Sequence, residues 1–213
     1  MTPSGGVKNR GRKAMFSLLP VEFRQSAIEG RGVFAKKAFS PGEIIVVYAP
    51  KHERLAADDP RATEAAATRL TLFTQDGCVL VPDQSAPGGW LCNHSCAPNA
   101  ALFSSGDGRV QCTRPIARGD EVTIFYGWVT CNGAGSAPCR CGAPACRGAI
   151  NFDVSDEDAA NVRIENGQLV TTNTRVRAKL EEYAEFLQSI GQEHVQRTVA
   201  TTLARLKDQP KGV

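Results

Sequence analysis

The sequence predicts a β-rich α+β fold, with one well-cored domain of short strands followed by a helical C-terminal extension. Short apolar runs recur from Val21 to Tyr126, and turn-forming glycines, prolines and aspartates separate them. Sustained helical spacing of apolar residues appears only after Gly148. The 213 residues, 42% of them hydrophobic, are enough to bury one core and to support an extension.

Charge and hydropathy exclude several classes of protein. The net charge of +3 is too small to indicate nucleic-acid binding by itself. No apolar run approaches the roughly 18 residues that a membrane span needs, and the N-terminus makes no convincing secretory signal. We therefore expect a soluble protein with no membrane partner and no direct nucleic-acid partner. The cysteines, scattered singly and in one cluster, indicate a reducing compartment and so an intracellular location.

The elements of the β-rich part are predicted in chain order. Residues 1–15, rich in Gly, Lys and Arg, are expected to form a mobile basic tail. Strands follow at VEFR, at GVFA and at IIVVY, the last ending at Tyr48 and expected to be largely buried. Residues 51–68 predict a loop and a short helix, and Asp76-Gly77 between two apolar runs predicts a hairpin. Further strands are expected at ALFSS, RVQCT and VTIFY.

The C-terminal part has helical spacing. Ser155 and Asp158 have the spacing of a helix start, and Asn166-Gly167 predicts another hairpin. Two helical runs follow: Val176, Leu180, Tyr183, Leu187 and Ile190, which Gly191 ends, and then Val195, Val199, Thr202 and Leu206. We expect these helices to pack on the core; the alternative is a partner-binding face or a dimer formed through them.

The eight cysteines fall into a scattered set and a cluster. Cys78, Cys92, Cys112 and Cys131 stand singly and are expected to be free thiols, most of them within strands. Cys139, Cys141 and Cys146 supply three thiolates within eight residues, between glycines and prolines that let the chain wrap an ion. A structural zinc site needs four ligands, and Cys131 is the nearest further thiol in sequence. A disulfide between Cys139 and Cys146 is disfavoured in a reducing compartment.

A polar stretch, LCNHSCAPNAA at residues 91–101, interrupts the apolar pattern. Burying such side chains is costly without partners, so the stretch is either a polar loop with a buried thiol or part of a site. Three more blocks accompany it: EGRGVFA at residues 29–35, GDEVTIFYG at 119–127 and CRCGAPACRG at 139–148. Together the four blocks resemble the SET-domain family of protein lysine methyltransferases, which carries a cysteine-rich post-SET segment.

The resemblance implies a domain organisation and two cofactors. It implies a SET catalytic domain at residues 16–128, built of small sheets with a knot-like crossing, with a short variable insert at 51–76. A post-SET zinc segment is expected at 129–152, and a hairpin and helices at 153–213. The implied methyl donor is S-adenosylmethionine, and the implied metal is a structural Zn²⁺ that holds the post-SET segment over the cofactor.

The resemblance also implies a role for particular residues. Tyr126 is expected to orient the lysine nitrogen and Tyr48 to line the lysine channel, each as part of the catalytic site. The residues expected to contact the cofactor are Gly30, Arg31, Gly32, Asn93 and His94, with His94 acting by packing and not as an acid or base. The expected channel residues are Ile124, Phe125 and Trp128, with Phe152 as a further candidate aromatic. The expected zinc ligands are Cys96, Cys139, Cys141 and Cys146, with Cys131 as the rival to Cys96.

Two departures from the family pattern bear on the product and on alternatives. Ile124 stands where relatives often have an aromatic residue, and it cannot hold the water that a phenol holds, which favours di- or trimethylation. The alternative is that a tyrosine elsewhere compensates for it and reverses this preference. Trp90-Leu91-Cys92 replaces the usual Arg-Phe-Ile lead-in. The implied substrate is a histone tail or another basic protein, in the nucleus of a eukaryote or in the cytoplasm or host of a bacterium. The alternative function is a catalytically silent, zinc-stapled interaction module.

Overall fold

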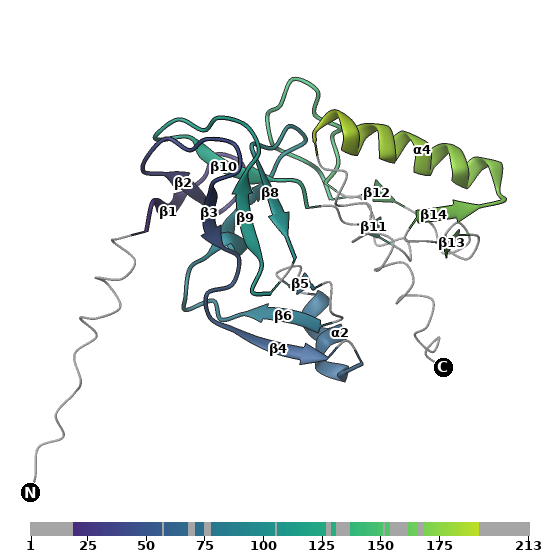
Figure 1. Cartoon of the computed structure of the whole chain (residues 1–213), viewed down its shortest axis with the longest axis horizontal. Helices are drawn as coiled ribbons and strands as arrows, with labels where there is room; N and C mark the ends of the chain where they lie inside the picture. Colours follow the sequence, from purple (N-terminus) through teal and green to yellow (C-terminus); the bar gives the residue numbers. More distant parts are fainter. Residues whose placement is uncertain are drawn as a thin grey trace, which may run out of the picture.

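The structure, a computed structural model, consists of small sheets with few helices (Figure 1). It describes residues 19–56, 58–67, 71–74, 78–104, 106–126, 129–130, 137–150, 152–153, 162–165 and 168–191. The strands up to residue 94 are β1 Val21–Gln25, β2 Arg31–Ala35, β3 Ile44–Val47, β4 His52–Ala56, β5 Leu72–Phe73, β6 Cys78–Pro82 and β7 Asn93–His94. The later strands are β8 Ala100–Phe103, β9 Arg109–Cys112, β10 Glu121–Ile124, β11 Val129–Thr130, β12 Phe152–Asp153, β13 Val162–Glu165 and β14 Gln168–Thr171. The helices are α2 Pro60–Ala67, the 3-10 turn η1 Gly89–Leu91 and α4 Thr174–Ser189.

A four-stranded sheet with the order β1-β2-β10-β7 organises the molecule. β1 and β2 form an antiparallel pair, and β10 adds antiparallel to the other edge of β2. β7 pairs parallel with β10, so that Asn93 lies opposite Thr123 and His94 opposite Ile124. This pairing brings the polar stretch at 91–101 against the strand that leads to Tyr126. The knot-like crossing and the predicted domain boundaries stay predictions.

A second sheet, β3-β9-β8, covers the core of buried side chains that it shares with the first. The expected strand IIVVY forms β3, but it is only half buried. Ile44 is 51% exposed and Val47 37% exposed, whereas Ile45 and Val46 are buried. β3 is an edge strand, and its register with β9 shifts between Ile44 and Val46. The shift turns two consecutive side chains inward and leaves the strand's ends outside.

The third sheet, β4-β6-β5, lies with α2; β4, α2 and β5 belong to the predicted insert at residues 51–76, and β6 follows it. The expected helix is α2, and the hairpin expected at Asp76-Gly77 joins β5 to β6, although residues 75–77 lie outside the described part. The expectation of a loop before α2 is wrong, because residues 52–56 form β4, paired with β6 along its whole length. The sequence pattern did not predict β4 because most of its side chains are polar and face water. Its backbone hydrogen bonds are made by pairing with β6.

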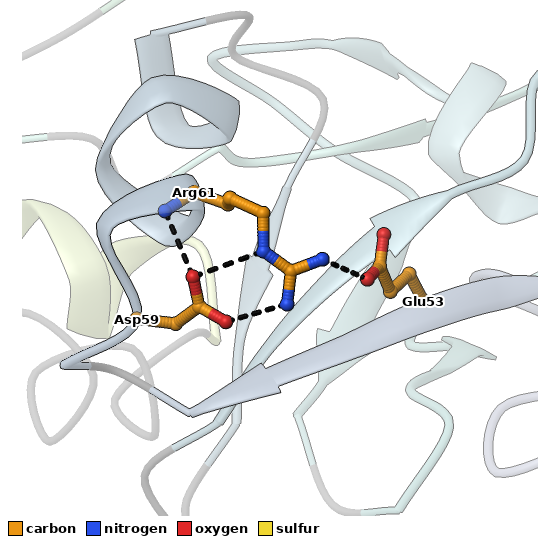
Figure 2. Close-up of polar contacts among 3 residues, drawn as sticks. All are labelled: Glu53, Asp59 and Arg61. Carbon is orange, nitrogen blue, oxygen red and sulfur yellow. Dashed lines mark hydrogen bonds and ion pairs between the residues drawn. The ribbon is translucent and has the colours of Figure 1, made fainter.

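The start of α2 is fixed by an ion-pair network with Arg61 at its centre (Figure 2). The Arg61 amide donates to Asp59 Oδ1 at 2.9 Å, which is the contact of a helix N-cap, and Pro60 occupies the first helical position. The Arg61 guanidinium donates to Asp59 Oδ2 and to Glu53 Oε1, both at 2.6 Å. Glu53 lies on β4, so the network fastens the helix to the sheet.

The C-terminal part contains two small two-stranded sheets and α4. β13 and β14 pair antiparallel on either side of the hairpin turn predicted at Asn166-Gly167, two residues that lie outside the described part. α4 follows the predicted spacing, with Val176, Tyr183 and Leu187 buried, and Gly191 after its end has a φ of 65°. The helix start predicted at Ser155 and the second helical run lie outside the described residues. Among the described residues, no helix is long and apolar enough to cross a membrane.

Candidate active site and metal centre

Four cysteine side chains converge from two distant parts of the chain. The sulfur atoms of Cys96, Cys139, Cys141 and Cys146 all lie within 4.8 Å of one another. Cys96 Sγ lies 3.8 Å from Cys139 Sγ and 4.0 Å from Cys146 Sγ. A tetrahedral Zn²⁺ with bonds of about 2.3 Å to sulfur places its ligands about 3.8 Å apart. The four thiols therefore fit such an ion, and the cluster could hold a metal. Cys131, the rival ligand, lies outside the described residues.

Backbone amides support these sulfurs. The Cys96 amide donates to Cys141 Sγ, and the Arg147 amide donates to Cys96 Sγ, each at 3.4 Å. Burial raises the pKa of the Cys141 thiol, but the amides of Cys96 and Ala143 and hydrogen bonds from neighbouring thiols outweigh it and lower that pKa to about 6. Charge-stabilising amides of this kind favour the thiolate, which is the form that binds metal.

His94 connects the cysteine cluster to Tyr126. The Tyr126 amide donates to His94 Nδ1 at 3.3 Å, and His94 Nε2 lies 3.5 Å from Cys96 Sγ. Burial, together with the charge of Arg147, lowers the pKa of His94 to about 4, so the ring is neutral near pH 7. A neutral ring that accepts at Nδ1 carries its hydrogen on Nε2, facing the sulfur. This arrangement agrees with a packing role for His94.

The two predicted site tyrosines lie near one another beside Cys92. The Tyr126 hydroxyl donates to the Cys92 carbonyl at 3.0 Å. Burial raises the pKa of Tyr48 above its ordinary value, and the neighbouring Tyr126 and Cys92 raise it further. Burial also raises the pKa of Tyr126. Both phenols are therefore neutral at physiological pH and can donate or accept hydrogen bonds.

The glycine segment, Gly30–Gly32, includes the first residues of β2 and lies against Asn93. Asn93 Nδ2 lies 3.1 Å from the Glu29 carbonyl, 3.3 Å from the Arg31 carbonyl and 2.8 Å from Glu121 Oε1. Gly30 has a φ of 48°, and a side chain there would meet no atom within 4 Å. The open space fits the close approach of a ligand to the backbone. Four of the five predicted cofactor residues, Gly30, Arg31, Gly32 and Asn93, thus lie together. The ring of the fifth, His94, contacts Cys96 and Tyr126 instead, and the contact of all five with S-adenosylmethionine stays a prediction.

Glu121 is a further residue of this place that the sequence analysis did not single out. Its two carboxylate oxygens accept hydrogen bonds from Ser26 Oγ at 2.8 Å, and one of them also accepts from Asn93. A Cβ at Gly32 would lie 2.3 Å from Glu121 Oε1, so any larger residue there would displace the carboxylate from its present place. The available signal was the position of Glu121 within one of the four blocks, directly before the predicted strand VTIFY.

The predicted channel residues are only partly described. Ile124 is buried, and Phe125 is 4% exposed, with its ring centroid 5.2 Å from that of His94 and 5.2 Å from that of Phe186. Phe125 thus packs between the NHSC segment, residues 93–96, and α4. Trp128 and the side chain of Phe152 lie outside what the structure describes. The assignment of these residues to a substrate channel stays a prediction.

Comparison with known families agrees with this geometry. Residues 30–127 match the SET domain family. This protein carries a SET domain. The glycine segment, β7 and β10 of the four-stranded sheet all fall inside the match, whereas the three clustered cysteines and α4 follow it.

Several curated proteins are similar to the chain beyond the SET domain. Histone-lysine N-methyltransferase TRX1 of Oryza sativa subsp. japonica is 28% identical over 172 residues, 76% of this chain and 16% of the relative. A histone-lysine N-methyltransferase of Yarrowia lipolytica, H3 lysine-4 specific, is 30% identical over 62% of this chain and 12% of its own. Another from that organism, H3 lysine-36 specific, is 31% identical over 63% and 18%. The chain spans less than a fifth of the length of each of these relatives.

Proposed function

We propose that this protein is an S-adenosylmethionine-dependent protein lysine N-methyltransferase. The observation that carries the proposal is the parallel pairing of β7 with β10 inside a SET domain. It sets Asn93 and His94 beside the strand end that holds Tyr126, and Asn93 in turn contacts the glycine segment. Three segments that the sequence assigned to one reaction therefore meet, although they lie far apart along the chain.

Methyl transfer to a lysine amine needs little general-base catalysis. A free lysine has a pKa of about 10.4, so about one amine in 10³ is unprotonated at neutral pH. An apolar channel lowers that pKa because it disfavours the charged ammonium. S-adenosylmethionine would supply the methyl group on a positively charged sulfur. Tyr126, a neutral phenol, would accept a hydrogen bond from the amine and aim its lone pair, and alignment supplies much of the acceleration.

The metal and the product follow from neighbouring residues. We propose Zn²⁺ as the ion of the cysteine cluster, because four thiols at tetrahedral spacing suit it. The ion would hold residues 139–148 against the NHSC segment, next to His94 and Tyr126. Ile124 has no hydroxyl to hold a water in the channel, so we propose di- or trimethylation as the product.

The proposed substrate is a histone or another basic protein. Its support is the similarity of the chain to histone-lysine N-methyltransferases of differing lysine specificity. A nuclear location follows for a eukaryotic protein. A homodimer has no support among the described residues, since the buried face of α4 contacts its own chain.

The test is methyl transfer from labelled S-adenosylmethionine to core histones and to a whole-cell extract, with mass spectrometry of the products. Tyr126→Phe is the matched variant, because it removes only the hydroxyl. We expect labelled lysines with the native protein and a loss of about tenfold or more with the variant. Absence of cofactor binding would overturn the enzyme proposal, and cofactor binding without any transfer would favour the silent interaction module.

A further inference from the structure

α4 lies beyond the SET match, yet it reaches the site. In Figure 1 the end of α4 that follows β14 lies away from the core, and its other end points toward the core strands. Tyr183 and Leu187, one turn apart near that inner end, are buried. Tyr183 lies 6.4 Å from the Phe125 ring, measured between ring centroids. The helix therefore packs against the residue that immediately precedes Tyr126.

Phe186 on α4 has two partners that belong to different parts of the site. The Arg147 guanidinium lies 4.9 Å from the centroid of the Phe186 ring, within the range of a cation–π contact. The Phe125 ring lies 5.2 Å from it at an interplanar angle of 58°, a favourable tilted arrangement of aromatic rings. One ring thus joins a cation to an aromatic core residue.

Each partner is one residue away from a group that the site needs. Arg147 follows Cys146 directly, and its amide donates to Cys96 Sγ. Phe125 precedes Tyr126 directly, and its ring also packs on His94, with the ring planes at 52°. A displacement of Phe186 would therefore change the packing of residues next to the cysteine cluster and of those next to Tyr126.

We propose that α4 is a working part of the catalytic unit, and that Phe186 is a positioning residue that clamps residues 139–148 to the strand end carrying Tyr126. The proposal concerns residues beyond the SET domain. The expected effect on methyl-transfer kinetics rests on the proposed methyltransferase function, whereas the expected effect on zinc release rests only on the cysteine cluster. In this arrangement α4 slows the opening of the cysteine segment and keeps Tyr126 aligned.

The test compares Phe186→Leu with Phe186→Tyr in the full-length, zinc-loaded protein. Leucine keeps an apolar side chain but has no aromatic face, whereas tyrosine keeps the ring. We expect Phe186→Leu to release zinc to a chelator about two- to tenfold faster, and Phe186→Tyr to release it at the native rate. With methyl donor and substrate present, we expect kcat to fall in Phe186→Leu by more than KM changes, because alignment is lost.

Arg147→Met and Gln188→Ala complete the design. If Arg147 acts through the Phe186 ring, the double variant Arg147→Met with Phe186→Leu releases zinc no faster than the faster single variant. Gln188→Ala, an exposed change on α4, should leave release and activity unchanged. Equal zinc release in Phe186→Leu and the native protein would overturn the clamp. Zinc release needs no methyl donor, so this result stands even if the native protein transfers no methyl group.

Discussion

At the scale of single residues, Tyr48 is enclosed by backbone that leaves no room for side chains. A Cβ at Gly88 would lie 2.6 Å from the Tyr48 carbonyl oxygen, and one at Gly89 would lie 3.1 Å from its Cα. A Cβ at Gly108 would lie 2.8 Å from Tyr48 Cβ and 2.5 Å from Leu72 Cδ2. The three glycines allow the chain to approach the tyrosine closely and fix where it lies.

We predict that Gly108→Ala destabilises the protein more than Gly106→Ala. Both glycines have positive φ, 71° and 59°, so each alanine brings a strain of about 1–2 kcal/mol. Only at Gly108 does the new Cβ collide with Tyr48, which adds about 1–3 kcal/mol. Urea unfolding of both variants measures the difference. An equal loss of unfolding free energy in the two variants would show that the residues around Tyr48 accommodate the new Cβ without further destabilisation.

We predict that Glu121→Gln weakens the glycine segment. The substitution replaces charge-assisted hydrogen bonds from Ser26 and Asn93 by weaker neutral ones, at a cost of about 1–2 kcal/mol. The dissociation constant of S-adenosylmethionine, measured by calorimetry, should rise with it. Glu22→Gln is the matched control, because its ion pair with Arg24 is exposed and such a pair contributes less than about 1 kcal/mol. Equal effects of the two changes would contradict a special role for Glu121.

At the scale of elements, local signals predicted most strands and both described α-helices. Alternating apolar residues and glycine turns identified β1, β2, β8, β9 and β10, and the Asp76-Gly77 and Asn166-Gly167 pairs identified two hairpins. β4 was not predicted because its residues are mostly polar, and only its pairing with β6 makes it a strand. The exposure of both ends of β3 was not predicted because a register shift against β9 sets which side chains face inward.

The N-cap of α2 gives a prediction for one element. Asp59→Ala removes the acceptor of the Arg61 amide, whereas Asp59→Asn keeps an acceptor and loses only the charge. We expect hydrogen exchange at the Arg61 amide to accelerate in Asp59→Ala and to stay near native in Asp59→Asn. Hydrogen bonds from Arg61 hold the pKa of Asp59 below its usual value. The stabilisation by its charge is therefore present above the pKa of unfolded Asp and is lost as pH falls through the folded value. Accelerated exchange in Asp59→Asn would instead assign the cap to the ion pair.

At the scale of the whole molecule, the cysteine cluster joins residues 139–146 to the NHSC segment in the SET domain. Cys96 belongs to the segment that follows β7, and the other three thiols lie after the SET match. Metal binding at such a cluster contributes directly to folding, since no such site exists in the unfolded chain. Among the described residues, His94 contacts both Cys96 and Tyr126, and Phe186 lies between Arg147 and Phe125, so both connect the cluster to the Tyr126 region.

We predict that Cys96→Ser loses the metal and lowers the melting temperature, whereas Cys78→Ser retains both. Cys78 is a half-buried free thiol outside the cluster, which makes it the matched control. Zinc content by elemental analysis and thermal unfolding measure the two effects. Cys131→Ser belongs in the same series. If Cys131→Ser loses zinc and Cys96→Ser retains it, the fourth ligand is Cys131 and not Cys96.

The sequence by itself determined the fold class, the four blocks of the site and the three clustered cysteines, because these depend on residue type and short spacing. Tertiary structure alone decided the contacts between blocks. The parallel pairing of β7 with β10, the carboxylate of Glu121 beside Gly32 and the Phe186 ring between Arg147 and Phe125 are of this kind. Each joins residues separated by many positions, and no local periodicity records which distant side chain fills a given space.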